Sequence, residues 1–189
     1  MNNILSLQFR IEKDTHLKSP SHPIFTELYE QFYINSRKTI TESNIQLLNH
    51  PIGLMCLYLD DGTLMINVQK KNNNIYITPA VGLSTLCFTK RECQILRDHL
   101  LNTFGIEFRL NTHPTGSGYS LVCSKLNSVD RFFKLIYPYC KNIESMRYKW
   151  DKEYRIQNSY HELIQNYSNK YKIKISALED IPSRYSPED

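Results

Sequence analysis

Residues 51–62, Pro-Ile-Gly-Leu-Met-Cys-Leu-Tyr-Leu-Asp-Asp-Gly, constrain the fold of this chain more than any other stretch. An uncharged run leads directly into Asp60 and Asp61, and a strand-like pattern follows. The run favours a buried helix, with Pro51 in its first turn and Gly62 at its end. Two carboxylates at the C-terminus of a helix lie at its negative pole. They must therefore be either solvated or neutralised by a cation.

Two interpretations of Asp60 and Asp61 are open at this point. In the first, the helix simply stops at a solvated Asp-Asp-Gly turn. In the second, the carboxylates bind a divalent metal, because hard oxygen ligands suit magnesium or calcium. The six histidines show no spacing typical of a metal site. The five cysteines show no CxxC spacing and indicate free thiols in a reducing compartment, so we expect a cytoplasmic (bacterial) or organellar protein that is not secreted.

The length and charge of the chain narrow its class. With 189 residues and 41% hydrophobic residues, it has room for one generous domain with extensions. No apolar run reaches the roughly 20 residues that a membrane span needs. Residues 51–150 carry twelve basic and seven acidic side chains. Twelve minus seven gives this segment a net charge of +5, which exceeds the net charge of +4 of the whole chain. This distribution of charge is compatible with a polyanionic partner, although the excess of positive charge is smaller than in a strongly basic nucleic-acid-binding domain.

The periodicity of apolar residues predicts the elements. We expect strands at 4–12, 63–71, 75–78, 106–111 and 119–124. We expect helices at 22–33 with Ser21 as cap, at 51–62, from a Thr89–Glu92 capping box to Gly105, and from a cap at Asn127 or Ser128 to Pro138. Residues 36–40 are expected to be a basic connector, residues 45–48 a short apolar piece, and residues 79–84 an inserted loop. One more helix is expected in the polar C-terminal extension, 151–189.

From residue 50, the order is helix, hairpin, helix, hairpin, helix. This order predicts an α+β fold, in which helices cover one face of a single antiparallel sheet. The uncovered face would carry polar side chains able to hydrogen-bond base edges in a DNA groove. These polar side chains are Asn67, Gln69, Lys71, Tyr76, Thr78, Arg109, Asn111 and Ser120.

Residues 54–62, Leu-Met-Cys-Leu-Tyr-Leu-Asp-Asp-Gly, resemble the LAGLIDADG motif of homing endonucleases in its Asp-Asp-Gly variant. The similarity continues through 85–89, the Glu92 helix, Phe104-Gly105, 132–139 and 145–149. The resemblance implies an αββαββα unit, two of which pair through their motif helices and form a saddle over double-stranded DNA. It also implies a metal-dependent DNA endonuclease, active in intron homing, that uses Mg²⁺ or another divalent cation.

The resemblance also implies roles for individual residues. Asp61, with Asp60 beside it, would bind the metal, and Lys149 matches the late basic residue that this family places near the scissile phosphate. Residues 1–49 would be the trailing half of a preceding unit, and residues 50–150 a whole unit. In that trailing half, Gln8 and Arg10 would bind DNA, and Lys38 would be the catalytic lysine.

One motif in this sequence supplies one set of acids. Either two chains pair as a homodimer, or a companion half-chain supplies the missing half, or the protein no longer cuts. Met55 stands where the family usually has a small residue, and we expect it to loosen helix pairing. Two alternatives remain: a non-catalytic DNA- or RNA-binding protein of the same fold, such as a degenerate endonuclease or an intron maturase-like protein, and an unrelated α+β domain.

Overall fold

The computed structural model describes residues 10–12, 16–71, 74–113, 116 and 118–171. The chain divides into two compact units, Met1–Thr39 and Ile40–Asp189. Each unit is described by itself. Within the described part of the chain, no helix has both the length and the apolar character needed to cross a bilayer.

The described residues of unit 1 form two small hairpins and one helix. Strand β1 (Arg10–Glu12) pairs antiparallel with β2 (His16–Lys18), which confirms the end of the predicted strand; its earlier part, including Gln8, lies outside the described residues. Helix α1 (Pro23–Phe32) is capped by His22, so the expected cap at Ser21 is wrong. The reason is Pro23, which takes the first helical position and makes the preceding residue the cap. The Nδ1 atom of His22 accepts from the Ile24 N–H at 3.2 Å.

The predicted connector at residues 36–40 is in part a hairpin, so that prediction is wrong. Strands β3 (Tyr33–Ile34) and β4 (Arg37–Lys38) pair antiparallel. Asn35 and Ser36 join them with φ angles of 50° and 61°, the left-handed pair that a tight hairpin turn of this type requires. Asn-Ser is a weaker signal than Asn-Gly, so the sequence pattern did not reveal it.

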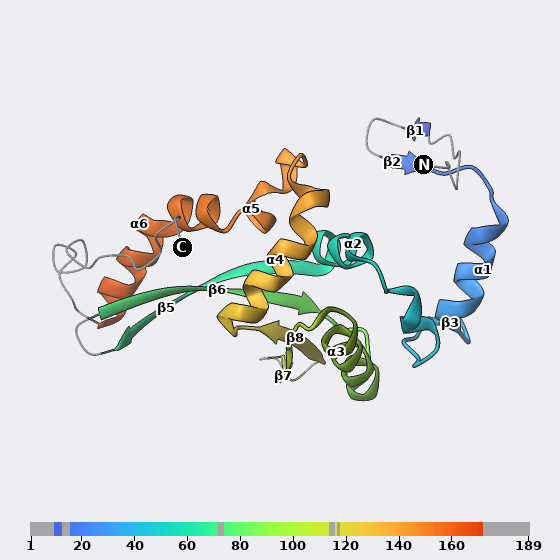
Figure 1. The fold of residues 1–189 in the computed structure, drawn as a ribbon, viewed down its shortest axis with the longest axis horizontal. Coiled ribbons are helices and arrows are strands. Elements are labelled where there is room, and N and C mark those ends of the chain that lie inside the picture. Colours follow the sequence, from blue (N-terminus) through green and yellow to red (C-terminus); the bar gives the residue numbers. More distant parts are fainter. Residues whose placement is uncertain (1–9, 13–15, 72–73, 114–115, 117, 172–189) are drawn as a thin grey trace. The chain divides into compact units, whose positions relative to one another are not determined.

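Unit 2 has the predicted α+β architecture (Figure 1). It opens with a short 3₁₀ helix where an apolar piece was expected, and the order helix, hairpin, helix, hairpin, helix then follows as predicted. The elements are η1 (Asn44–Leu47), α2 (Pro51–Asp61), β5 (Gly62–Lys71), β6 (Asn74–Ser84), α3 (Lys90–Phe104), β7 (Arg109–Thr112), β8 (Tyr119–Cys123), α4 (Leu126–Cys140), η2 (Glu144–Met146), α5 (Arg147–Trp150) and α6 (Lys152–Tyr171).

The sheet is antiparallel throughout, with strand order β5-β6-β8-β7. The predicted loop at residues 79–84 is wrong, because these residues continue β6 and pair with β5, Pro79 lying opposite Ile66. Strand β8 pairs with β6 only at Val81–Ser84. Pro79 thus lies outside the described pairing of β6 with β8, so its missing N–H breaks no bond of that ladder. Its proline and glycine content made this segment look like a loop.

The core lies between one face of the sheet and a layer of helices. Leu64, Val81, Leu83, Leu121 and Cys123 alternate toward this face and are almost completely buried. The helices α2, α3 and α4 contribute the other side of the same core, and α4 crosses β6 (Figure 1). Their buried side chains include Leu54, Tyr58, Leu96, Leu100, Phe132 and Ile136.

The helix ends follow the sequence in one case and depart from it in another. The Thr89–Glu92 capping box of α3 is present, and Gly105 ends that helix in the left-handed conformation at φ 67°, both as predicted. Helix α4 instead begins after Lys125 with no side-chain cap, and Pro138 lies inside it. A proline this close to a helix end removes one hydrogen bond, while buried Cys140 keeps the last turn on the core.

The C-terminal extension forms α6, which runs along β5 (Figure 1). Its Ile164 side chain is 5% exposed. This confirms the further helix expected there, and it shows that the extension packs on the long β5–β6 hairpin. The end of the extension lies outside the described residues.

Candidate functional site

Asp60 and Asp61 form the last turn of α2, and both are exposed. Among the residues that the structure describes, neither carboxylate has a hydrogen-bond or ion-pair partner. The helix before them is buried through Leu54, Met55, Tyr58 and Leu59. The sequence therefore places two free acids at the end of a helix that is otherwise fixed in the core.

A cation from a distant part of the chain reaches this negative helix end. The ammonium of Lys149, on α5, donates to the carbonyl oxygen of Leu59 at 2.6 Å and to that of Asp60 at 3.2 Å. These carbonyls lack partners inside the helix, and a positive charge is favourable there. The two predicted catalytic positions of unit 2, the acids and the late lysine, thus meet at one place.

Tyr58 joins the same two elements from the inside. Its hydroxyl donates to the backbone carbonyl of Lys149 at 2.6 Å, and its side chain is fully buried. The ring packs edge-on against Phe132, with centroids 4.9 Å apart. Burial raises the pKa of Tyr58 far above its ordinary value, so the hydroxyl stays protonated and donates. The sequence analysis did not single out Tyr58; its signal is that it is the one aromatic residue in the apolar run.

The donor set at the end of α2 fits part of a divalent-cation site. No group of three or more His, Cys, Asp or Glu side chains able to hold a metal occurs among the described residues. Magnesium often takes one or two carboxylates from a protein and completes its shell with water and phosphate oxygens. Asp60 and Asp61 match that requirement, because they are exposed oxygen donors on a rigid element. They do not form a closed protein cage.

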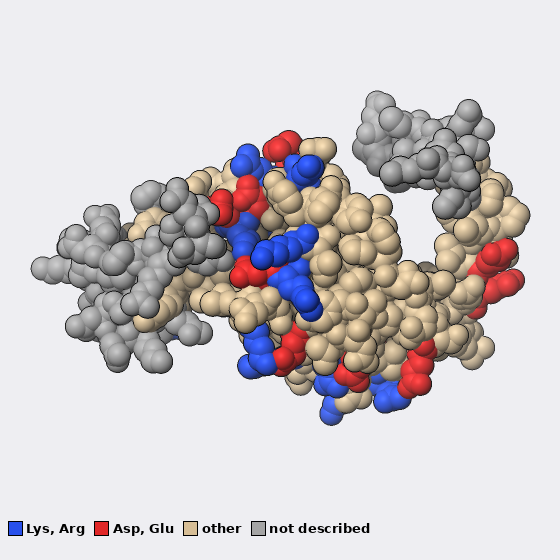
Figure 2. Space-filling model, viewed as in Figure 1, with Lys and Arg blue, Asp and Glu red and all other residues tan. Residues whose placement is uncertain are grey.

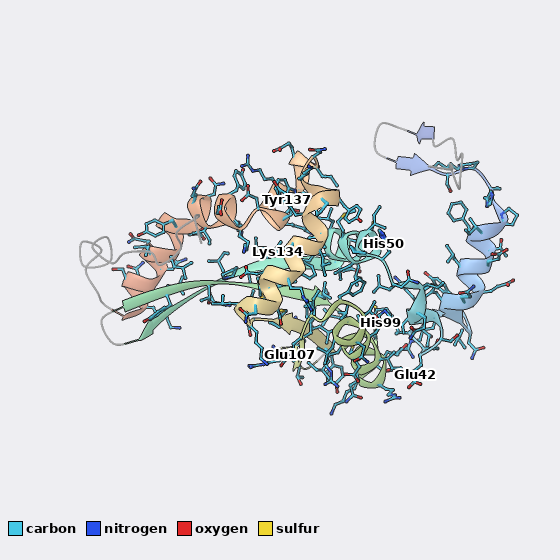
Figure 3. All side chains as sticks on the ribbon, viewed as in Figure 1. Glu42, His50, His99, Glu107, Lys134 and Tyr137 are labelled. Carbon is cyan, nitrogen blue, oxygen red and sulfur yellow. The ribbon has the colours of Figure 1, made fainter. Side chains whose placement is uncertain are left out.

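The histidines of unit 2 that flank α2 have structural roles. His50 caps α2, its Nδ1 accepting from the Ile52 N–H at 3.2 Å. His99, on α3, is 6% exposed, and its Nε2 lies 2.7 Å from the Leu48 carbonyl oxygen. Figure 3 shows both residues in unit 2. His50 and His99 therefore stabilise the start of α2 and the segment before it.

Strand register places the predicted polar set on one face of the sheet, opposite the core. Asn67 pairs with Thr78, Gln69 with Tyr76, and Asn111 with Ser120. Lys71 has the same parity on β5, and Arg109 pairs with Val122 on β7. Asn67, Arg109 and Asn111 are exposed. We call this surface the open face, defined by Asn67, Gln69, Lys71, Tyr76, Thr78, Arg109, Asn111 and Ser120.

Unit 1 holds the remaining predicted residues. Arg10 lies in β1 and Lys38 lies exposed in β4. Gln8 is outside the described residues. Their roles stay predictions.

The outward side of α2 carries Ile52, Gly53, Cys56, Leu57 and Asp60, which are exposed or half-buried. Met55 is on the opposite side and is 7% exposed in the core. The expectation that Met55 loosens the pairing of motif helices stays a prediction, and its side chain packs in the core of its own unit. A small residue, Gly53, and the short Cys56 side chain lie on the outward side instead, and small residues permit close helix approach.

The helix side of unit 2 carries both signs of charge next to one another (Figure 2). Several of these groups pair, as in Lys152 with Asp130 at 2.6 Å and Arg147 with Asp151 at 3.0 Å. This surface is therefore unlike a basic patch for a nucleic acid.

A sequence model described as the LAGLIDADG DNA endonuclease family matches residues 1–132. The chain belongs to the LAGLIDADG DNA endonuclease family. The match covers most of the chain and includes all of unit 1 and unit 2 as far as residue 132. It also confirms the family that residues 54–62 suggested.

Two solved structures are similar to this LAGLIDADG chain. One is described as the homing endonuclease I-WcaI bound to its DNA recognition sequence; it is 22% identical with a TM-score of 0.56, and the match covers 77% of this chain and 62% of that one. The chain thus spans about 62% of the length of that relative. The homing endonuclease I-TnaI matches with a TM-score of 0.40 and 15% identity, over 59% of this chain and 73% of that chain. The likeness to the I-WcaI structure supports the fold.

Proposed function

We propose that this protein is a site-specific DNA endonuclease of the homing type that hydrolyses phosphodiester bonds with Mg²⁺ or another divalent cation. The observation that carries the proposal is the meeting of Asp60, Asp61 and Lys149 at the end of α2. Family membership supplies the class of chemistry, and the I-WcaI structure, bound to its DNA recognition sequence, supports DNA as the partner.

Each residue has a proposed role in that reaction. Asp61, with Asp60, would hold the cation against a DNA phosphate. When bound, a divalent cation activates water as a nucleophile and stabilises the leaving oxygen. Lys149 would stabilise negative charge developing on the phosphate, since its ammonium already lies at the same helix end. Lys38 would be the equivalent lysine of the other unit.

The open face is the proposed DNA interface. A two-stranded ribbon fits the major groove, and β5 and β6 form such a ribbon beyond the point where β8 stops pairing. Exposed Asn67 and Asn111 are suited to hydrogen-bond base edges, and exposed Arg109 to a phosphate or a guanine. Gln8 and Arg10 would extend the interface from the other unit.

A complete cleavage site needs a second set of acids. We propose that it comes from a homodimer or a companion half-chain, joined through the outward side of α2. Gly53, Cys56 and Leu57 offer that surface. The alternative is a non-catalytic DNA- or RNA-binding protein, either a degenerate endonuclease or an intron maturase-like protein.

The first measurement is the mass of the purified chain in solution by light scattering, followed by cleavage of a randomised DNA library with Mg²⁺. Magnesium-dependent cuts at a defined sequence by a dimer support the homodimeric endonuclease. Asp61→Asn should abolish the cuts and retain binding of the selected DNA. If the variant still cuts, the metal assignment is wrong. Selective binding without cuts, at any magnesium concentration, favours the non-catalytic alternative.

A further inference from the structure

Reciprocal hydrogen bonds join the motif helix α2 to α5 in the C-terminal part of unit 2. Tyr58, in the last turn of α2, donates to the main-chain carbonyl of residue 149, and the side chain of that same Lys149 donates back to the carbonyls of Leu59 and Asp60. The donor–acceptor distances of 2.6, 2.6 and 3.2 Å are all within hydrogen-bonding range. We call these three bonds the α2–α5 clasp.

The two halves of the clasp differ in their exposure. The Tyr58 ring is fully buried and is held by Phe132 and Phe133, so its hydroxyl has a fixed position. Lys149 is half-buried, and its ammonium reaches the exposed end of α2. The inner bond fixes the backbone from which the outer side chain extends.

Other contacts hold α5 but do not fix Lys149. Trp150 is 8% exposed and its Nε1 donates to the Ile143 carbonyl at 3.0 Å. This anchors α5 to the turn before it. The main chain of residue 149 is linked to α2 by the Tyr58 hydroxyl, and this bond can orient the lysine relative to Asp60 and Asp61.

We propose that Tyr58 is a positioning residue: its buried hydroxyl holds residue 149 so that the Lys149 ammonium stays beside the Asp60–Asp61 pair. The proposal rests on the proposed function for its catalytic meaning, since Lys149 is there the group that meets the phosphate. Tyr58 itself is buried and does not touch DNA. Its effect passes through Lys149.

The clasp is tested without DNA by acetylating the folded protein with an N-hydroxysuccinimide ester and following each lysine by mass spectrometry. In the natural chain, Lys149 should react more slowly than exposed Lys134 and Lys141, because its amine must first leave two acceptors. Tyr58→Phe keeps the ring and removes the hydroxyl. Its Lys149 should react roughly two- to tenfold faster, the factor that one neutral hydrogen bond represents.

Tyr148→Phe is the matched control. Tyr148 lies on α5, the helix of Lys149, and is 46% exposed. Its hydroxyl has a long 3.8 Å contact with the Met146 sulfur. It should leave the Lys149 rate unchanged. The proposal is overturned if Lys149 reacts as fast as Lys134 in the natural chain, or if Tyr58→Phe accelerates all lysines equally through general loosening. The first of these outcomes needs no variant to fold.

A second readout addresses the catalytic meaning. If the natural chain cleaves DNA, Tyr58→Phe should lower the single-turnover rate at saturating DNA while the Kd for DNA is unchanged. A changed Kd with an unchanged rate overturns the positioning role. If the natural chain cuts no DNA, the proposed function fails, and the acetylation rates still decide whether the clasp exists.

Discussion

A methyl group added at Gly62 would lie 2.1 Å from Cδ2 of Tyr58 and 2.3 Å from the Tyr58 carbonyl oxygen. The backbone at Gly62 is extended, with φ −92°, so any residue can adopt it. Glycine is therefore needed at the end of the Asp-Asp-Gly turn for space. The last turn of α2 and the first residue of β5 pack too closely for a side chain between them.

Gly62→Ala should lower the free energy of unfolding by about 2 kcal/mol, because it overpacks a fixed aromatic ring. The measurement is urea unfolding followed by circular dichroism. Gly53→Ala, inside α2, is the control, because an added methyl there would meet the flexible end of Leu48 at 3.0 Å. That change should stay within about 1 kcal/mol. Equal losses in the two variants would contradict the steric explanation.

Arg109→Ala should weaken DNA binding and reduce the slope of log K against log salt by about 1 if the guanidinium touches a phosphate. Binding is measured by fluorescence anisotropy at several salt concentrations. Arg91→Ala is the control, because Arg91 is exposed on α3, where it pairs with Glu42 at 2.5 Å. It should leave the slope unchanged. An unaltered affinity in Arg109→Ala would move the DNA interface away from β7.

Two of the five thiols should react quickly in the folded protein. Cys56 and Cys87 are exposed, and Cys93, Cys123 and Cys140 are buried. Titration with Ellman's reagent at pH 8 should give two fast equivalents, and all five after unfolding. Cys56→Ala should remove one fast equivalent. Fast reaction of a third thiol would show that the core opens readily.

The buried thiols predict weaker stability in alkali. Burial raises the pKa of Cys123 and of Cys140 to about 11 each. The unfolded chain releases these protons from about pH 8.5, while the folded chain retains them. The unfolding free energy therefore falls as the pH rises through this window.

Urea unfolding at pH 8 and pH 10 tests this expectation. The unfolding free energy of Cys123→Ala should fall less between pH 8 and pH 10 than that of the natural chain, although the variant is less stable at both pH values. Exposed Cys56 has no such burial, so Cys56→Ala should keep the full loss. An identical pH dependence in all three proteins would contradict the assignment to Cys123.

The parts of the fold that local signals specify were predictable. Pro51 and Gly62 bracket α2, and the Thr89–Glu92 capping box opens α3, as the sequence indicates. The alternation of β5 correctly separated its core face from the open face. Each of these features depends on residues a few positions apart.

The parts that depend on distant contacts were not predictable. Tyr58 and Lys149 are 91 residues apart, and nothing near either residue indicates their hydrogen bond. The same limit explains β6, where the pairing with β5 overrides a local composition of proline and glycine. The side of α2 on which Met55 lies was likewise not predictable, because a uniformly apolar helix gives no clue to which side faces its own core.

Pro79 has a consequence for the width of the sheet. It has no main-chain N–H to offer, and it lies on β6 just past the stretch where β8 pairs. A further strand cannot extend the ladder regularly along that edge, whether it comes from this chain or from another molecule. At this point of β6 the β5–β6 ribbon is therefore a poor template for regular edge-to-edge association.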